Sequence, residues 1–268
     1  MSNFSNIGFV IDSEDDLARL LDQVGTISKP IPTKQGNYFY YSDPSGAELW
    51  IQINPKNELI GFNPHYRGKS RFKVGLTTAI PGEMSELDGS FHGWADPLDA
   101  NDPESGAYPF VFDVPDFKSL KEFILPQAVE IQLSAFAQEL TVYDDEEDYH
   151  ASQTSEVKFA TQSFIPIGLF GSDESDQTQP TMNQARGLFA GIIREWEIKK
   201  NTFTNEPFYT LLVDTLGGAI DVVADNRFFE KEPRINGVVK GVFWLSGRIL
   251  TTAHAQGIIP TVVYRCDV

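Results

Sequence analysis

The chain has 268 residues and carries 38 acidic against 21 basic side chains, a formal net charge of −17. Its length suits one large domain or two ordinary ones, and its aromatic content of 12% excludes an intrinsically disordered chain. The single cysteine, Cys266, excludes a disulfide framework and a zinc site built from several thiolates. No apolar run approaches the roughly 18 residues of a membrane helix, and the N-terminus lacks the features of a secretory signal, so we expect a cytoplasmic protein.

The charge is distributed unevenly along the chain. The first 180 residues carry 11 basic and 29 acidic side chains, whereas the remainder carries 10 and 9. Such an acidic first part repels nucleic acid and anionic membranes. The polar stretch 172–184 lacks apolar periodicity and predicts a linker. We therefore predict an acidic domain over residues 1–171 and a second domain over residues 185–268.

The first domain begins with a predicted strand over residues 7–12, where apolar and small or polar positions alternate. A helix follows, with Ser13 as its cap and acidic residues in its first turn. Strands are then expected over residues 37–42 and 47–53, joined by the turn Asp-Pro-Ser-Gly that starts at Asp43.

The strand and helix register recurs 103 residues later, where Phe110, Phe112 and Val114 match the first strand. This match predicts a duplicated β-α-β-β-β module, with copies at about residues 4–66 and 107–171. The alternative is that any two amphipathic strand–helix units look alike.

A unit that opens with NIGFVID, closes on DPSGAELWIQ and occurs twice resembles the vicinal oxygen chelate, or glyoxalase-like, superfamily. The resemblance implies a cupped sheet that commonly holds a divalent metal. At the family's two usual ligand positions in the first module, this chain has Asn6 and Trp50. A catalytic metal needs about three ligands such as His, Asp or Glu. We therefore expect a retained scaffold, a lost metal site and no cofactor.

Aromatic side chains are the first candidates for a ligand site. By strand alternation, Tyr38, Tyr40 and Trp50 share one face of the paired strands, whereas Phe39 and Tyr41 point the other way. If that face lines the cup, it forms a cavity for a flat apolar ligand. Otherwise these residues are core beneath the helix, which is the commoner role for aromatic residues.

His92 and Trp94 are further candidates, in a turn-rich loop predicted for residues 84–109. A histidine near carboxylates serves as a base or a ligand, or is simply exposed on a loop. The acids between Asp96 and Glu104 suggest a calcium loop, but their spacing is not that of an EF-hand, and a solvated acidic loop is the alternative. The sequence has no phosphate-binding loop and no nucleophile elbow.

The second domain is predicted to be a small β-barrel. It contains a strand over residues 189–198, a hairpin that turns at Gly217 and Gly218, and strands over residues 240–250 and 257–266. Five strands with a longer connector after the third resemble an OB-fold barrel. Such barrels often bind nucleic acid in a basic groove, but the acids here balance the bases.

The sequence thus predicts an α+β protein: paired βαβββ glyoxalase-like modules followed by a small OB-like β-barrel. The expected function is non-catalytic, either binding of a small apolar or aromatic ligand or docking of a protein partner or second copy. One alternative is a metal-dependent lyase, isomerase or dioxygenase with an atypical ligand set that includes His65 and His92. Another is a barrel that binds single-stranded nucleic acid, although we expect neither nucleic acid nor a membrane as partner.

Overall fold

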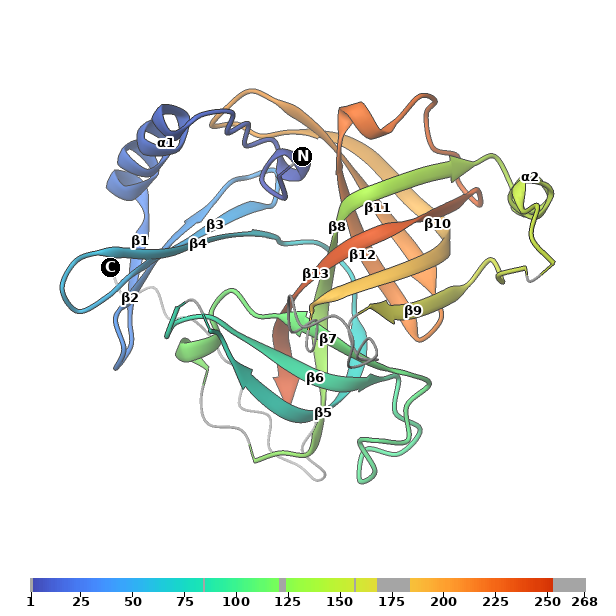
Figure 1. The fold of residues 1–268 in the computed structure, drawn as a ribbon, viewed down its shortest axis with the longest axis horizontal. Helices are drawn as coiled ribbons and strands as arrows, with labels where there is room; N and C mark the ends of the chain where they lie inside the picture. The colour runs from blue at the N-terminus through green and yellow to red at the C-terminus, as the bar shows by residue number, and fades with distance from the viewer. Residues whose placement is uncertain (1, 84, 121–123, 157, 168–183, 253–268) are drawn as a thin grey trace, which may run out of the picture.

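The computed structural model describes residues 2–83, 85–120, 124–156, 158–167 and 184–252. These residues form a four-stranded sheet, a nine-stranded sheet and two α-helices (Figure 1). The fold is therefore sheet-rich and belongs to the mainly β or α+β class. No helix within the described ranges is long and apolar enough to cross a membrane.

The smaller sheet is an antiparallel meander that follows a helix. Its strands, in spatial as well as chain order, are β1 (Lys29–Pro32), β2 (Asn37–Ser42), β3 (Ala47–Ile53) and β4 (Leu59–Tyr66). Helix α1 (Glu14–Ile27) begins where predicted, because the Ser13 side chain accepts a hydrogen bond from the Asp16 backbone N–H. The predicted turn is also confirmed: Gly46 has a φ of 97°, and its N–H donates to the Asp43 carbonyl.

The strand predicted over residues 7–12 is wrong. Ser5–Ile7 form the 3-10 helix η1, and the residues that follow join no sheet. The buried Asn6 side chain donates to the Ala137 carbonyl and accepts from the Asp225 N–H. These long-range hydrogen bonds fasten the segment to the larger sheet, so Asn6 has a structural role.

The larger sheet is mixed and uses most of the remaining chain. Its strands are β5 (Phe72–Pro81), β6 (Gly89–Ala95), β7 (Pro109–Asp113), β8 (Gln127–Tyr143), β9 (Ser163–Ile167), β10 (Arg186–Lys200), β11 (Pro207–Thr215), β12 (Gly218–Asp225) and β13 (Val238–Thr252). Short helices lie between some of them: η2 (Phe117–Ser119), α2 (Glu146–Ser152) and η3 (Asn226–Phe228). The long strands β8 and β13 pair antiparallel over nearly their whole length and form a two-stranded ribbon (Figure 1).

This ribbon belongs to two closed barrels. At one end its edges pair with β12 and β10, which β11 joins, so the first barrel has the order β10–β11–β12–β8–β13. At the other end its edges pair with β5 and β7, which β6 joins, so the second barrel has the order β5–β6–β7–β13–β8. In each barrel one contact is parallel, β12 with β8 and β7 with β13, and the other contacts are antiparallel. β9 extends the first barrel along the edge of β10.

An approximate twofold axis relates the two barrels. Strands β5, β6, β7 and β8 correspond in order to β10, β11, β12 and β13, because each strand pairs with the equivalent neighbours in the same directions. The last strand of each set of four also forms part of the other barrel. The register fixes the equivalent residues. Asp221 pairs with Ser134 on β8, Asp113 pairs with Ser246 on β13, and the two serines pair with each other. The axis therefore passes between Ser134 and Ser246.

One hydrophobic cluster fills both barrels. Along the ribbon, Ile131, Leu133 and Ala135 of β8 and Phe243 and Leu245 of β13 are buried in this cluster. Successive side chains of a strand point to opposite faces, so the residues between them face the outside of the barrels. The two barrels therefore share one continuous core.

The N-terminal segment and the small sheet cover the outer face of the first barrel. Ile7 and Phe9 are fully buried in a second cluster with Phe136 of β8, Phe208 of β11 and Val223 of β12. The same cluster contains α1 and β3 side chains, so helix, small sheet and first barrel are packed together.

Other expectations need correction or lie outside the described residues. The loop predicted for residues 84–109 contains strand β6. Of the helix expected after the first strand of the second module, the described residues contain only η2. The predicted strand 257–266, Cys266 and all but the last residue of the predicted linker lie outside the described residues. The larger sheet takes strands from both sides of that linker, because β8 precedes it and β13 follows it.

The shared ribbon makes the two sides of the chain interdependent. We predict that residues 1–171 and residues 184–268, expressed separately, each fail to unfold cooperatively, because neither fragment holds both ribbon strands. Mixing them should restore a cooperative transition. Circular dichroism melting of each fragment and of the equimolar mixture tests this, and a sharp transition for either fragment alone would contradict it.

Candidate functional site

The two faces of the small sheet have different characters. On β3, Leu49 and Ile51 face the cluster with α1, whereas Glu48, Trp50 and Gln52 face the opposite way. This opposite face looks toward the second barrel: Gln52 hydrogen-bonds to Asp88 and Ser85 in the β5–β6 connection. The polar face of the small sheet thus forms an interface with the second barrel.

The predicted alternation of the aromatic residues is confirmed. Tyr38, Tyr40 and Trp50 pack together with Leu87 on the polar face, and Phe39 and Tyr41 belong to the cluster on the other face. The Tyr38 hydroxyl donates to the Leu87 carbonyl at 2.5 Å, and burial raises the pKa of Tyr38. Tyr38 and Trp50 are 0% and 1% exposed, so they fill the interface as core residues.

His92 and Trp94 lie apart from that aromatic group, on β6. They share one face of the strand with Ser90, two and four residues away. His92 Nδ1 lies 2.6 Å from the Thr77 hydroxyl, and burial lowers the pKa of His92. The structure therefore divides the five predicted site residues into two groups.

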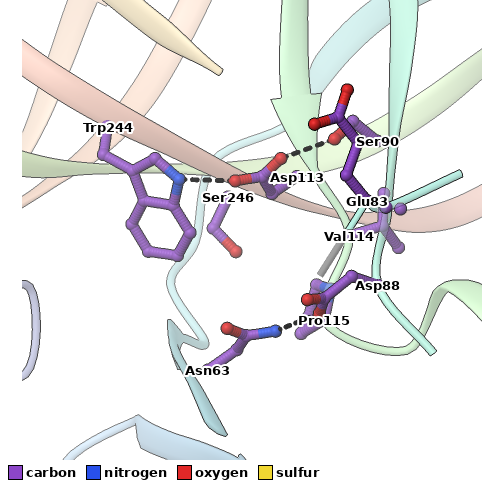
Figure 2. A pocket seen from close by; sticks show the side chains of 11 residues that line it. Asn63, Glu83, Asp88, Ser90, Asp113, Val114, Pro115, Trp244 and Ser246 are labelled. Carbon is purple, nitrogen blue, oxygen red and sulfur yellow. Dashed lines mark hydrogen bonds between the residues drawn. The ribbon is translucent and has the colours of Figure 1, made fainter. Parts of the chain in front are cut away.

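A cavity of about 200 Å³ lies between β4, the β5–β6 connection, β6, β7 and β13 (Figure 2). One wall is the indole of Trp244. The polar side chains that line it are Asn63, Glu83, Asp88, Ser90, Asp113 and Ser246. Of the predicted candidates none lines this cavity, although Ser90 shares the outer face of β6 with His92 and Trp94.

Asp113 is a carboxyl group of the cavity wall whose two oxygens both accept hydrogen bonds. One oxygen accepts from the Ser90 hydroxyl and the other from the Trp244 indole N–H, both at 2.6 Å (Figure 2). Burial raises the pKa of Asp113, the two hydrogen bonds oppose this shift, and the negative charge of Asp88 adds to it. The site therefore holds a carboxyl group in a position where a positive charge would be favourable.

Asp88 forms the facing side of the cavity. Its Oδ1 accepts from the side-chain amides of Gln52 at 2.6 Å and Asn63 at 2.7 Å. Both amides belong to the polar face of the small sheet, so that sheet orients Asp88. Glu83 adds a third carboxyl group, and the described lining contains no Lys or Arg.

A buried hydrogen-bond network connects the cavity wall to the twofold axis. His65 Nε2 lies 3.0 Å from the Gln132 Oε1 and Nδ1 lies 2.8 Å from the Ser246 hydroxyl. Because an amide oxygen only accepts, the proton of His65 is assigned to Nε2, and Nδ1 accepts from Ser246. Gln132 Nε2 in turn donates to Asp221 at 2.8 Å. The network thus links β4 to both ribbon strands.

A serine bonded to a histidine at a cavity wall can also begin a nucleophilic dyad. Two features favour a structural role here. The partner of the imidazole is the neutral amide of Gln132, and burial together with the charge of Arg248 holds the pKa of His65 well below its usual range. Such an imidazole accepts a proton poorly, and Ser246 is only 1% exposed.

A buried charge cluster borders the cavity. Glu48 is fully buried, and burial raises its pKa although Arg248 lies 3.6 Å away. Arg248 also pairs with Asp116 at 3.4 Å, and its guanidinium lies 5.2 Å from the Trp50 ring centre. Arg248 follows Ser246 on the same face of β13, about 7 Å further along the strand. This cluster holds the small sheet against the ribbon.

The equivalent of Asp113 in the first barrel is enclosed by backbone. Asp221 accepts from the Lys69 N–H at 3.0 Å and from the Ser70 N–H at 2.8 Å. Gly68 allows this approach, because a Cβ at that position would lie 2.1 Å from the Asp221 carboxyl group. The connection between β4 and β5 therefore fills the place that the cavity occupies in the second barrel.

Comparisons of this chain with protein-family models, with curated proteins and with solved structures found no match. Within the described part of the chain, no group of three or more His, Cys, Asp or Glu side chains is placed to hold a metal ion.

His65 should make the stability of the protein depend on pH. Its pKa is lower in the folded chain than the usual value near 6.5, so the unfolded chain binds more protons below that pH and stability falls as the pH falls. The contribution reaches about 1.4 kcal/mol per pH unit. Denaturant unfolding of the wild type and of His65→Gln at pH 7.5, 6.0 and 5.0 measures it. Parallel pH dependences for the two proteins would refute this role of His65.

Gly68 should be intolerant of any side chain. We expect Gly68→Ala to lower the free energy of unfolding by about 2 kcal/mol or more, because the new methyl group displaces the backbone from Asp221. The matched control is Gly25→Ala in α1, where a Cβ would meet no atom within 4 Å apart from its chain neighbours and the backbone of its own helix, and where alanine favours the helix. Urea unfolding of both variants tests the contrast, which fails if the two changes have similar effects.

Proposed function

We propose that this protein binds a small polar molecule in the cavity between the small sheet and the second barrel, without catalysing a reaction. The observation that carries the proposal is the convergence of polar side chains from separate elements on one cavity in an otherwise packed interface. Binding sites commonly combine such a cavity with a few oriented polar groups.

The dimensions and charge of the cavity restrict the ligand. Its volume of about 200 Å³ is below the range of roughly 300–1,000 Å³ typical for drug-sized ligands, so a molecule of the size of an amine or an amino acid fits best. The three carboxyl groups favour a positively charged or hydroxyl-rich compound, in contrast to the flat apolar ligand expected at the aromatic residues. The net charge of −17 also attracts cations toward the molecule.

The strand order of the barrels supports both the proposed site and an OB-like description. If β5, β6, β7, β8 and β13 are numbered 1 to 5, the second barrel has the strand order 1-2-3-5-4-1, with strands 3 and 5 parallel, as in an OB-fold barrel. The first barrel has the same order when β10, β11, β12, β13 and β8 are numbered 1 to 5. Ser90 and Asp113 lie on the outer face of β6 and β7, which correspond to strands 2 and 3 of the second barrel. The face of these two strands carries ligands in many OB-fold proteins.

The alternatives have less support. The corresponding face of the first barrel, on β11 and β12, is covered by Ile7 and Phe9, which leaves no groove there for single-stranded nucleic acid. A metal-dependent enzyme would need a ligand set, and the described residues place His65 and His92 in separate surroundings. The resemblance to the glyoxalase-like superfamily stays a prediction, and so does docking of a protein partner.

Binding at the cavity can be tested with a library of small polar compounds. We expect members of the library to shift the indole N–H signal of Trp244 in ¹⁵N NMR spectra. Asn63→Leu should weaken their binding about tenfold, because it removes a polar group that lines the cavity and orients Asp88.

The control is Gln23→Leu, which introduces the same side chain on the exposed surface of α1 and should leave affinity unchanged. The proposal fails if no compound perturbs the Trp244 signal, or if Asn63→Leu binds as tightly as the wild type.

A further inference from the structure

The first barrel shows what can occupy the place beside a carboxyl group in this framework. There the two oxygens of Asp221 accept from two successive backbone N–H groups, those of Lys69 and Ser70, at 3.0 and 2.8 Å. The Ser134 hydroxyl donates to the Tyr66 carbonyl of the same segment at 2.6 Å. A pair of neighbouring N–H donors, one to each carboxylate oxygen, is thus the group that this arrangement of carboxyl and hydroxyl holds.

The second barrel repeats the arrangement around the cavity. Asp113 and Ser246 are the equivalents of Asp221 and Ser134, and both line the cavity. Trp244 stands two residues before Ser246, as Gln132 does before Ser134, and its N–H donates to Asp113 as Gln132 donates to Asp221. The hydrogen-bond framework of the carboxyl group is therefore conserved between the two halves of the molecule.

What differs is the number of donors to the carboxyl group. Asp221 Oδ2 accepts two hydrogen bonds and Oδ1 accepts one, whereas each oxygen of Asp113 accepts one from the described residues. A carboxylate oxygen has two lone pairs, so both oxygens of Asp113 retain capacity for a further donor. That capacity faces a cavity in place of a backbone segment.

The charge around Asp113 decides between a neutral and a cationic donor pair. Glu83 and Asp88 line the same cavity, and the described lining offers no positive side chain to balance them. A neutral amide leaves three acidic groups uncompensated, whereas a cation is attracted by all three. The Trp244 indole adds an aromatic wall on which a flat cation can stack.

From these observations we propose that the cavity binds a small planar cation with paired N–H donors, a guanidinium or amidinium group, on the Asp113 carboxylate. The inference rests on the proposed function and adds the chemistry of the ligand to it. The two N–H groups of such a fork can each donate to one carboxylate oxygen. In the first barrel the Lys69 and Ser70 N–H groups likewise donate to the two separate oxygens of Asp221.

Three probes of similar size separate the properties of the ligand. Methylguanidinium offers charge and paired N–H groups, tetramethylammonium offers charge without N–H groups, and glycerol offers hydroxyl groups without charge. Titration calorimetry on the full chain, together with the Trp244 indole signal in ¹⁵N NMR, measures each affinity. We expect methylguanidinium to bind at least about tenfold more tightly than either other probe.

Variants of the cavity acids locate the contact. Asp113→Asn should weaken methylguanidinium binding about tenfold or more, because it removes the charge of the proposed contact. Asp88→Asn should weaken binding only several-fold. It also removes a charge, but its asparagine oxygen can still accept from Gln52 and Asn63, so the cavity wall keeps its arrangement. The matched control Asp22→Asn removes one charge on the exposed face of α1 and should change the affinity less than about twofold.

The outcomes distinguish the two proposals. Tighter binding of tetramethylammonium or glycerol at the Trp244 signal would overturn the guanidinium inference and keep the cavity as a binding site. Equal loss of methylguanidinium affinity in Asp113→Asn and Asp22→Asn would also overturn the inference, because it would show binding through net charge. If none of the three probes shifts the Trp244 signal, the guanidinium inference fails, and the proposed function fails with it only if the compound library also leaves that signal unchanged.

Discussion

The antiparallel pairing of β8 with β13 is the interaction on which the rest of the structure depends. The pairing extends from Tyr143 and Val238 at one end to Val129 and Thr252 at the other, so the ribbon reaches through both barrels. Each barrel uses one half of the ribbon as two of its five strands. A single hydrophobic core follows, because the inward side chains of the same two strands fill both barrels. Loss of this pairing would open both barrels at once.

The small sheet is placed by polar contacts that meet on the outer face of the ribbon. Buried polar groups are costly unless they are hydrogen-bonded, and His65 and Gln132 satisfy one another there together with Ser246. The charges of Glu48 and Arg248 hold the sheet next to this point. The two equivalent barrels differ in what lies beside the corresponding carboxyl group. In the first barrel the chain covers its own carboxyl group, and in the second barrel it leaves a cavity beside the corresponding group.

Local features of the fold could be predicted from the sequence, whereas the long-range ones could not. The cap at Ser13, the turn at Gly46 and the opposite faces of Tyr38 and Phe39 depend on neighbouring residues, and the structure confirms them. The sequence did not predict strand β6, because glycines and flanking acids are typical of loops. In the structure Gly93 is a strand residue at a close contact, where a Cβ would lie 2.7 Å from Val74.

The repeat of the two barrels and the cavity depend on strand pairing between distant segments. This repeat has a weak sequence signal, chiefly the Leu-Ser pairs at residues 133–134 and 245–246. A change in surface charge suggested the boundary near residue 180, but surface charge carries no information about which strands exchange hydrogen bonds. The cavity residues come from four strands and the connection between β5 and β6, so no local pattern identifies them.

The position of β13 in the chain has a consequence for biosynthesis. The second barrel starts with β5, but the strand that closes it is the last one described, made more than 150 residues later. Until β13 has been synthesised, β7 and β8 lack this pairing partner, so the sheet formed by β5 to β8 has unpaired edges that other nascent chains can reach. Residues 72–143 carry 12 acidic and only 3 basic side chains, and the mutual repulsion of these acids gives the growing polypeptide a means of staying dispersed until its final strand is made.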